Sequence, residues 1–242
     1  MSGPPAGRLA VAAIAVAAVQ AFPGTTWLPF VRAPMPALNG IGRPDHVALT
    51  FDDGPHPAST PHFLEMLAAQ GVHATFFLLG DRVKRWPELT RRIVDEGHEI
   101  ALHGWQHRYA FWNSPQLVRS LALLDSVTGI RPRWFRPPYG VLSTSALLES
   151  RRAGLQPILW TAWGKDWTRR ATPDSIVRTL GSGLRGGSTL LLHDAVTSSA
   201  LTSWHATIGA LPLIIGRCRE AVLEVGPLAD HGIAPLGRRA PV

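Results

Sequence analysis

Short apolar runs alternate with longer segments of helical periodicity over most of this chain. The runs that predict strands are His46–Phe51, Ala74–Leu79, Glu99–Leu102, Trp134–Phe135, Pro157–Trp160, Thr189–Leu192 and, more weakly, Ala221–Val225. Most of them are almost continuously apolar and do not alternate with polar residues. This pattern favours a parallel sheet that is covered on both faces.

Between these runs, apolar residues recur at intervals of three and four, which predicts amphipathic helices. The predicted helices are Thr60–Gln70, Pro87–Glu96, Pro115–Thr128, Ser143–Ala153, Pro173–Leu180 and His205–Ile215. Three of them begin with a hydroxyl residue before a proline, as in Thr172-Pro173, and glycines such as Gly71 follow their ends. The alternation predicts six or seven β-α units, which fit an open doubly wound sheet or a closed barrel.

The two ends of the chain depart from this alternation. Leu9–Phe22 is apolar except for Gln20 and follows Arg8. It is shorter than the roughly 17–25 residues of a membrane-spanning helix and resembles the core of a signal peptide. An uncleaved anchor that continues through Phe30 and an extra helix packed on the domain are the alternatives.

We therefore expect residues 1–30 to be a signal peptide or membrane anchor and residues 31–45 to be a linker rich in Pro, Gly and Arg. The domain itself is expected over 46–225, with residues 226–242 as a tail packed on the outside. This organisation predicts an extracytoplasmic protein, either secreted or associated with the cell membrane.

Length, charge and cysteine content narrow the class. A chain of 242 residues is the usual size for one α/β barrel. Its net charge of +7 reflects either a GC-rich genome or attraction to an anionic surface such as a cell-wall polymer. Runs of Lys and Arg are never longer than two residues, which argues against nucleic-acid binding. A single cysteine, Cys218, excludes an intrachain disulfide.

Paired carboxylates follow the first predicted strand. Asp52 and Asp53 precede the turn residues Gly54 and Pro55. Adjacent strand residues point to opposite sides, so a bend at Gly54 would be needed to bring both carboxylates into one pocket. One could then bind a cation while the other accepts a proton. Two turn aspartates that cap backbone amides are the alternative.

Two histidines four residues apart offer further metal ligands. His103 and His107 would lie on one face of a helix, although Gly104 and the neighbouring aromatic residues favour an irregular loop. Two imidazoles and one carboxylate suit zinc, and also cobalt, nickel or iron, with an open position for water. Asp53, His103 and His107 are therefore candidate metal ligands, the alternative being two unrelated histidines.

Other charged residues also lie at or near predicted strand ends. Arg136 is followed by two prolines and could hold a carboxylate with two hydrogen bonds. His193 is placed for proton transfer, and Asp166 could tune the pKa of a charged neighbour. A surface arginine and a capping histidine are the alternatives. Because a barrel brings the carboxyl ends of all its strands to one mouth, this placement favours the barrel over the open sheet.

Together these strings closely resemble the motifs of the polysaccharide deacetylase family, also called the NodB homology domain or carbohydrate esterase family 4. The strings are Thr50-Phe-Asp-Asp-Gly54, His103-x3-His107, Arg136-Pro-Pro-Tyr139 and Leu190-x-Leu-His193. The resemblance extends from about His46 to Val225 and implies a single-domain, distorted (β/α)7 barrel. It also implies an enzyme that removes N-acetyl groups from N-acetylhexosamine residues of a glycan and releases acetate.

The resemblance assigns a role to each motif residue. It implies Asp52 as general base and His193 as general acid, with Arg136 holding Asp52 and Asp166 pairing with the catalytic charged groups. The implied metal ligands are Asp53, His103 and His107, which would hold a divalent metal, in the first place Zn²⁺, with Co²⁺ or Ni²⁺ as alternatives. The backbone N–H of Tyr139 would stabilise the oxyanion, and Trp167 and Leu192 would line the floor that receives the acetyl methyl.

Two positions depart from the family pattern. Gly104 stands where the family usually has Ser or Thr, so we expect altered rigidity of this loop and retention of the metal. Trp163 stands where the fourth motif, Asp-x-x-Asp-Trp, has its first acid, which affects charge tuning and the shape of the sugar site.

Three functions are compatible with these residues. The first is an extracytoplasmic N-deacetylase, expected to be monomeric, that acts on peptidoglycan or a chitin-like glycan. The second is a deacetylase of a small amide such as an acetylated polyamine. An open groove lined by Trp105, Trp112 or Trp163 would favour the polymer. The third is a catalytically silent glycan-binding protein. The retained residues argue against it, namely Asp52, Asp53, His103, His107 and His193.

Overall fold

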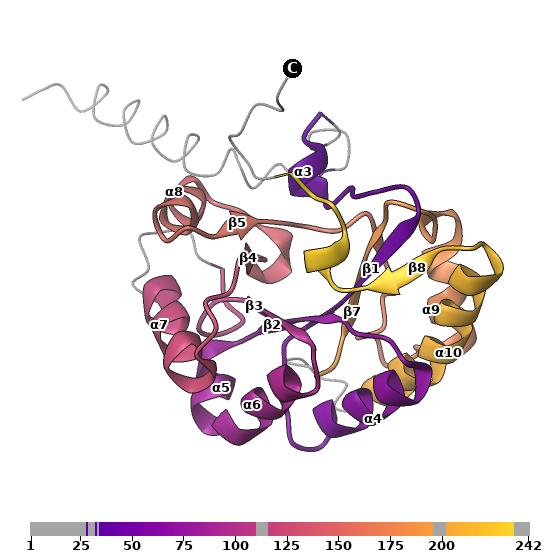
Figure 1. The fold of residues 1–242 in the computed structure, drawn as a ribbon, viewed down its shortest axis with the longest axis horizontal. Helices are drawn as coiled ribbons and strands as arrows, with labels where there is room; N and C mark the ends of the chain where they lie inside the picture. The colour runs from indigo at the N-terminus through magenta and orange to yellow at the C-terminus, as the bar shows by residue number, and fades with distance from the viewer. Residues whose placement is uncertain (1–27, 29–31, 33, 110–115, 196–201, 235–242) are drawn as a thin grey trace, which may run out of the picture.

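Parallel strands form one curled sheet at the centre of the molecule (Figure 1). The computed structural model describes residues 28, 32, 34–109, 116–195 and 202–234. The strands are β1 His46–Asp52, β2 Thr75–Leu78, β3 Glu99–Leu102, β4 Trp134–Phe135, β5 Gln156–Pro157, β6 Ala162–Trp163, β7 Thr189–His193 and β8 Glu224–Gly226. Their order is β5-β4-β3-β2-β1-β7-β6, and β8 pairs with the start of β1.

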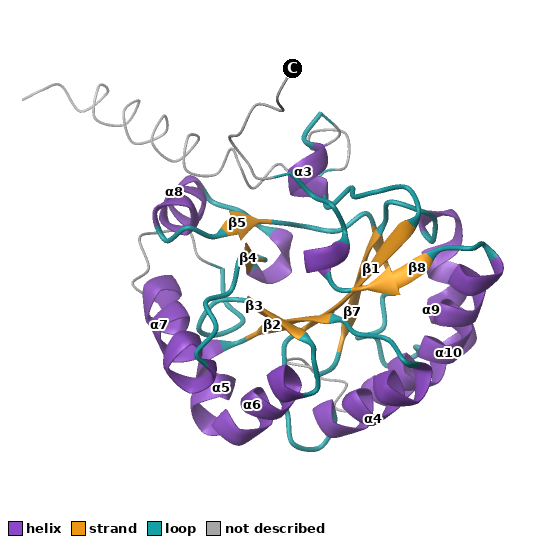
Figure 2. Cartoon of the chain, in the orientation of Figure 1, coloured by secondary structure: helices purple, strands orange, loops and turns teal. Residues whose placement is uncertain are grey.

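Helices surround this sheet on the outside (Figure 2). The α-helices are α3 Pro36–Asn39, α4 Thr60–Gln70, α5 Gly80–Arg85, α6 Pro87–Asp95, α7 Gln116–Thr128, α8 Thr144–Arg152, α9 Pro173–Leu180 and α10 Trp204–Glu220. Helix α10 continues beyond the predicted end at Ile215. A single glycine such as Gly216 costs only about 1 kcal/mol inside a helix, and burial of Cys218 on the same apolar face as Leu211 and Ile214 offsets it.

The predicted barrel is confirmed, as a sheet that stays open between β5 and β6. The prediction of one strand over Pro157–Trp160 was wrong, because β5 pairs with β4 and β6 pairs with β7. Between them, the N–H of Leu159 donates to the carbonyl of Leu38 at 2.8 Å. A backbone group occupied in this way cannot join the ladder of a neighbouring strand. Residues 158–161 therefore span the opening of the barrel.

Alternation along the strands divides the core into two parts. Val47, Leu49 and Phe51 of β1 pack outward against the helices in the larger apolar cluster. Ala48 faces inward and packs in a second cluster with Phe77, Ala101, Trp134, Ile158, Leu228 and Ile233. Further along the same inner face come Thr50 and Asp52. The inside of the barrel is therefore apolar at its amino-terminal end and polar at its carboxyl-terminal end.

The segment after Gly226 was predicted to pack on the outside, but part of it enters the barrel. Leu228 is fully buried, and its N–H donates to Thr75 Oγ1 at 2.8 Å. The N–H of Ala229 donates to Glu99, whose other oxygen accepts from the indole of Trp134 at 2.8 Å. Polar side chains at this end of the sheet thus accept hydrogen bonds from the backbone N–H groups of the segment. Leu228 can therefore be buried and close the amino-terminal end of the barrel.

Replacing Leu228 with alanine should destabilise the protein by about 2–4 kcal/mol, because a fully buried leucine leaves a cavity in a confined cluster. The thermal midpoint should fall by roughly 5–10 °C in a scanning calorimetry experiment. Leu213→Ala on α10 is the matched control, since 44% of Leu213 is exposed. Equal midpoints for the two variants would contradict a closing role for the tail.

Residues 36–39, within the segment expected to be a linker, form α3, and Leu38 is buried in the larger cluster. The predicted signal peptide or anchor at residues 1–30 lies outside the described residues except for Leu28. Within the described part of the chain, all helices are too short or too polar to cross a membrane.

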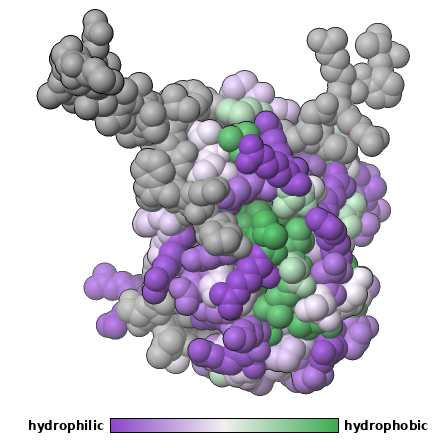
Figure 3. Space-filling view, turned by 90° about the vertical axis from the view of Figure 1, so that its left-hand side faces the viewer, coloured by the Kyte–Doolittle hydropathy of each residue, from purple (hydrophilic) through white to green (hydrophobic). Residues whose placement is uncertain are grey.

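Figure 3 shows the side that carries α7 and α8, where apolar residues gather in a band between hydrophilic ones. Val118 and Leu148 are exposed on these two helices.

Candidate active site

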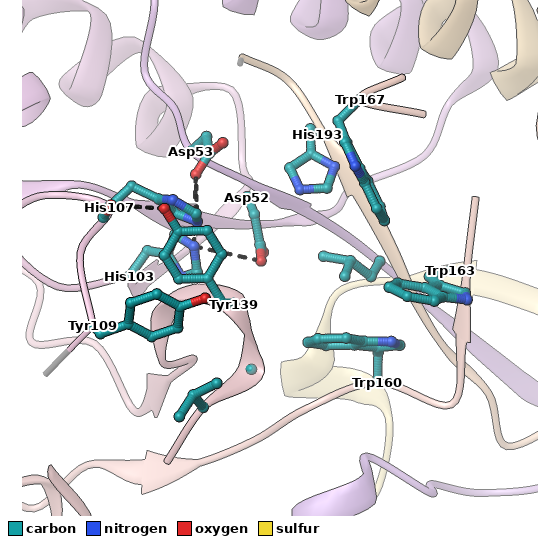
Figure 4. Close-up of a pocket in the computed structure, with 13 residues that line it drawn as sticks. Asp52, Asp53, His103, His107, Tyr109, Tyr139, Trp160, Trp163, Trp167 and His193 are labelled. Atoms are coloured by element: carbon teal, nitrogen blue, oxygen red, sulfur yellow. Dashed lines mark hydrogen bonds and ion pairs between the residues drawn. The ribbon is translucent and has the colours of Figure 1, made fainter. Parts of the chain in front are cut away.

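The motif residues meet in one pocket of about 580 Å³ at the carboxyl ends of the strands. Asp52 and Asp53 come from the end of β1, His103 and His107 from the loop after β3, and His193 from the end of β7. Figure 4 shows the carboxylates and the first two histidines on one side of the pocket and His193 with Trp167 on the other. The barrel thus brings together residues that lie up to 141 positions apart in the sequence.

The carboxylate of Asp52 is held by a fully buried arginine. Arg136 donates from Nη1 to Asp52 Oδ1 at 2.6 Å and to Thr50 Oγ1 at 2.8 Å, and from Nη2 to the carbonyl of Leu159 at 3.0 Å. This pairing was implied by the family resemblance. Because Oδ1 is engaged, the second oxygen, Oδ2, is the one that lies 3.7 Å from His103 Nε2. Asp52 is therefore fixed in orientation and keeps one carboxylate oxygen on the pocket side.

Asp53 reaches the same pocket because the backbone turns at this residue, not at Gly54 as expected. Its φ of 78° is in the left-handed region, which few residues other than glycine adopt. Gly54 is required for a different reason: a Cβ there would lie 2.4 Å from Asp194 Oδ2. A strained residue that the surrounding structure holds in place is common at functional sites. The turn aims two consecutive carboxylates into one cavity.

Asp53, His103 and His107 form the three-residue cluster that fits a metal ion. One ligand atom from each lies within 4.8 Å of the others. Asp53 Oδ1 is 3.6 Å from Nε2 of each histidine. His103 Nδ1 lies 2.8 Å from the carbonyl of Arg136, so Nδ1 carries the proton and Nε2 presents a lone pair to the cluster. Two nitrogens and one oxygen are the donor set of a catalytic zinc site.

The charges of this cluster also favour cation binding. Burial lowers the pKa of His107 to about 4, so its imidazole is neutral at physiological pH and able to bind a metal. Burial alone would raise the pKa of Asp53, but the cationic groups around it, His193 foremost, together outweigh burial and lower it. The cluster therefore presents a carboxylate and neutral imidazole at the pH where the protein would work.

His193 and Asp166 form a second charged pair across the pocket. His193 Nδ1 lies 2.9 Å from Asp166 Oδ1, and the N–H of His193 donates to Oδ2 at 2.7 Å. Thr207 on α10 donates to the same oxygen at 2.9 Å, a contact that no local sequence signal indicates. Burial opposes protonation of His193, but the charge and hydrogen bond of Asp166 outweigh it and raise the pKa to about 9. His193 is thus a protonated group at neutral pH.

Aromatic side chains form the other walls of the pocket. Trp167, predicted from the sequence, packs edge to face against His193 with ring centres 5.3 Å apart. Trp163 and Trp160 continue this wall, with ring centres 6.0 Å apart. The apolar run Pro157–Trp160 predicted Trp160 to lie within a strand. It lines the pocket because residues 158–161 span the opening between β5 and β6.

Tyr139 and Tyr109 stack on each other on the opposite side, with ring centres 4.3 Å apart (Figure 4). Trp105, a candidate for the groove, instead lies under Arg119, whose guanidinium is 3.7 Å from the ring centre. Trp112 lies outside the described residues. Among the tryptophans proposed for the groove, Trp163 is the one that the described structure places in the pocket.

The prediction that Leu192 lines the pocket was wrong. Leu192 is fully buried in the larger core cluster, and Leu191 lines the pocket in its place. The strand period of two explains the difference, since residues that share a face with His193 are two positions away. The predicted apolar floor is therefore formed by the neighbouring leucine.

The loop that carries both histidines is braced by backbone hydrogen bonds. The N–H groups of Gly80 and Asp81, at the start of α5, donate to the carbonyls of Gly104 and Trp105 at 2.9 Å. Helix α5 was not predicted, because its six residues contain little apolar periodicity. Gly104 has a φ of 93°, where a side chain would be strained. The glycine thus suits the loop conformation, and the unpaired N–H groups of a helix start hold it.

Comparison with known proteins agrees with this geometry. The polysaccharide deacetylase family matches residues 39–158. A chitooligosaccharide deacetylase from Bradyrhizobium sp. (strain ANU 289) is 36% identical over 194 residues, which cover 75% of this chain and 88% of that protein. A peptidoglycan-N-acetylglucosamine deacetylase from Bacillus cereus is 37% identical over 155 residues, or 61% of this chain and 72% of that protein.

Solved structures share the fold. The crystal structure of the Bc1960 peptidoglycan N-acetylglucosamine deacetylase superposes with a TM-score of 0.77 at 27% identity, covering 88% of this chain and 100% of that chain. The sequence similarity to the curated relatives spans most of both chains, and the motif residues converge as the resemblance required. This chain therefore belongs to the polysaccharide deacetylase family, the NodB homology enzymes of carbohydrate esterase family 4.

Proposed function

We propose that this protein is a metal-dependent hydrolase that removes N-acetyl groups from N-acetylhexosamine residues of a cell-wall glycan. The observation that supports it most is the arrangement of two charged pairs around one cluster of metal ligands. Asp52 is held by Arg136 on one side, and His193 is held by Asp166 on the other. Such a pocket contains a carboxylate that can accept a proton and an imidazolium that can donate one. Hydrolysis of an amide requires both groups.

The residues of the chain account for the movement of protons. Asp52 takes a proton from the attacking water through Oδ2, while Arg136 keeps Oδ1 in place. The water oxygen adds to the acetyl carbon, and the backbone N–H of Tyr139 stabilises the negative oxygen that results. His193 then gives its proton to the sugar nitrogen as the C–N bond breaks. The products are acetate and an amino sugar.

Asp53, His103 and His107 would hold the divalent metal, which we propose to be zinc because of the two nitrogen donors and one oxygen donor. When bound, a metal of this kind lowers the pKa of water and polarises a carbonyl. The apolar walls formed by Trp167 and Leu191 would receive the acetyl methyl group. All of these groups come from one chain, so we propose that a monomer is active.

We also propose that the enzyme acts outside the cytoplasm, secreted or associated with the membrane. The apolar segment Leu9–Phe22 after Arg8 and the net charge of +7 support this proposal. An exported, positively charged enzyme would be located on the same side of the membrane as an acetylated, anionic wall polymer.

The direct test is acetate release from N-acetylglucosamine oligomers and from purified peptidoglycan by the metal-stripped protein, with and without added zinc or cobalt. We expect release that depends on the metal. If the metal is bound and neither glycan releases acetate, the glycan assignment is wrong, and an acetylated polyamine is the next substrate to assay. If the metal does not bind, the catalytic proposal itself is wrong.

Replacing Asp166 with asparagine should move the alkaline limb of the pH–rate profile to lower pH by at least about one unit. His193 acts in its protonated form, so activity falls as the pH rises through its pKa, which is about 9 with Asp166 in place. Without that carboxylate, burial dominates and the proton is lost at lower pH. Thr207→Val, which keeps the charge and removes one hydrogen bond, should shift the limb less. An unchanged limb in Asp166→Asn would contradict the proposed role of His193.

A further inference from the structure

An exposed lysine lies over the aromatic wall of the pocket. Lys165 is one of two lysines in the chain, and its Nζ is 5.2 Å from the ring centre of Trp163. Trp163 lines the pocket and contacts Trp167, with ring centres 5.3 Å apart. Trp167 in turn contacts His193. A continuous series of ring contacts therefore connects the lysine to the catalytic side of the pocket.

The backbone separates Lys165 from its neighbour Asp166. Lys165 has a φ of 52°, a left-handed conformation that is uncommon for a residue other than glycine. Asp166 is 1% exposed and directed at His193, whereas Lys165 is exposed to solvent. The turn thus buries the acid under the catalytic histidine and leaves the cation beside the mouth of the pocket.

The exposed cations of this loop have no ion-pair partner among the described residues. Arg169 and Arg170 follow on the same loop and are exposed. Of the ion pairs found between described residues, none involves Lys165, Arg169 or Arg170. Asp166, the acid on this loop, is already engaged by His193 and Thr207. A cation on an aromatic face next to the pocket attracts an anionic group of a ligand that stacks on that wall.

We infer that the mouth of the pocket selects a glycan that carries a carboxylate close to the reacting N-acetyl group, with Lys165 as the group that binds it. This inference rests on the proposed function and adds the substrate class. A sugar ring would pack on Trp163 and Trp160 while its acidic substituent meets the ammonium group. Glycan strands whose N-acetylmuramic acid residues carry a free lactyl carboxylate, without a stem peptide, have this chemistry, whereas N-acetylglucosamine oligomers are neutral.

The test compares kcat/KM on two substrates of equal length. One is a neutral N-acetylglucosamine oligomer, and the other alternates N-acetylglucosamine with N-acetylmuramic acid that has a free carboxylate. We expect the wild type to prefer the acidic oligomer by about tenfold at low salt, with the preference decreasing as salt screens the charges. Lys165→Met should lose most of this preference through a higher KM, while kcat changes little, because the lysine lies outside the reacting groups.

Two controls isolate the charge. Lys84→Met removes the only other lysine, which is exposed on α5, and should keep the wild-type preference. Converting the carboxylate of the acidic oligomer to a neutral amide should reduce wild-type kcat/KM to that of Lys165→Met. Equal effects of Lys165→Met on both oligomers, or no effect on either, would overturn the inference while acetate release remains. Absence of acetate release from both oligomers by the metal-loaded wild type would instead refute the proposed function.

Discussion

Replacing Asp52 with asparagine should lower kcat for acetate release by about 10³–10⁴-fold while the metal stays bound. The effect is at the upper end for a single general base because an amide cannot accept the proton of the attacking water. Asparagine keeps an oxygen for Arg136 Nη1, which donates to Asp52 Oδ1 at 2.6 Å in the native protein. The ligands Asp53, His103 and His107 are unchanged. The measurements are steady-state kcat and metal content after dialysis.

The Asp52→Asn variant also leaves the buried charge of Arg136 without its partner, and the loss of one partner of a buried ion pair costs about 3–5 kcal/mol. Unfolding must therefore be monitored by circular dichroism at the assay temperature. Asp125→Asn on the exposed surface of α7 is a matched control and should behave like the wild type. If folded, metal-loaded Asp52→Asn retains turnover within tenfold of the wild type, Asp52 is not the base.

Replacing His107 with alanine should weaken zinc binding by roughly 100-fold or more and abolish turnover with it. His107 supplies one of three ligand atoms, and its Nε2 lies 3.6 Å from Asp53 Oδ1. His107 is a cleaner test of the metal site than His103. The Nδ1 of His103 lies 2.8 Å from the carbonyl of Arg136, so replacing His103 would also disturb the arginine that holds Asp52. Competition with a chromogenic chelator measures the zinc affinity directly.

The matched control for His107→Ala is His62→Ala, which removes a histidine that is more than half exposed on α4. It should bind zinc and release acetate as the wild type does. High zinc concentration should restore part of the activity of His107→Ala if the loss is one of affinity. Wild-type zinc affinity in His107→Ala would exclude this residue from the metal site.

The pattern of the sequence predicted the helices and strands well where the signal was local. Thr60–Gln70 and Pro173–Leu180 agree with the structure at both ends, because proline at a helix start and glycine at its end act through the nearest residues. Helix α5 and strand β6 escaped prediction. The first has little apolar periodicity, and the second is defined by pairing with β7, a distant segment.

The site was predicted residue by residue through its motifs, but its walls were not. Asp53, His103 and His107 converge as the resemblance implied. The resemblance placed Leu192 in the pocket, but alternation along β7 puts Leu191 on the face of His193 and Leu192 in the core. A motif gives the residue types of a strand end, and the fold decides which of them face the pocket.

By itself, then, the sequence determined the chemistry of this protein, because carboxylates, imidazoles and a guanidinium at the ends of strands indicate metal-assisted hydrolysis whatever their exact positions. The tertiary structure decided which surfaces surround that chemistry. Trp160 lines the pocket because the barrel is open between β5 and β6. Leu228 closes the other end because Thr75 and Glu99 accept hydrogen bonds from the backbone N–H groups of its segment. These contacts join residues far apart in the chain, and packing between distant segments leaves no local pattern of hydrophobic and polar positions.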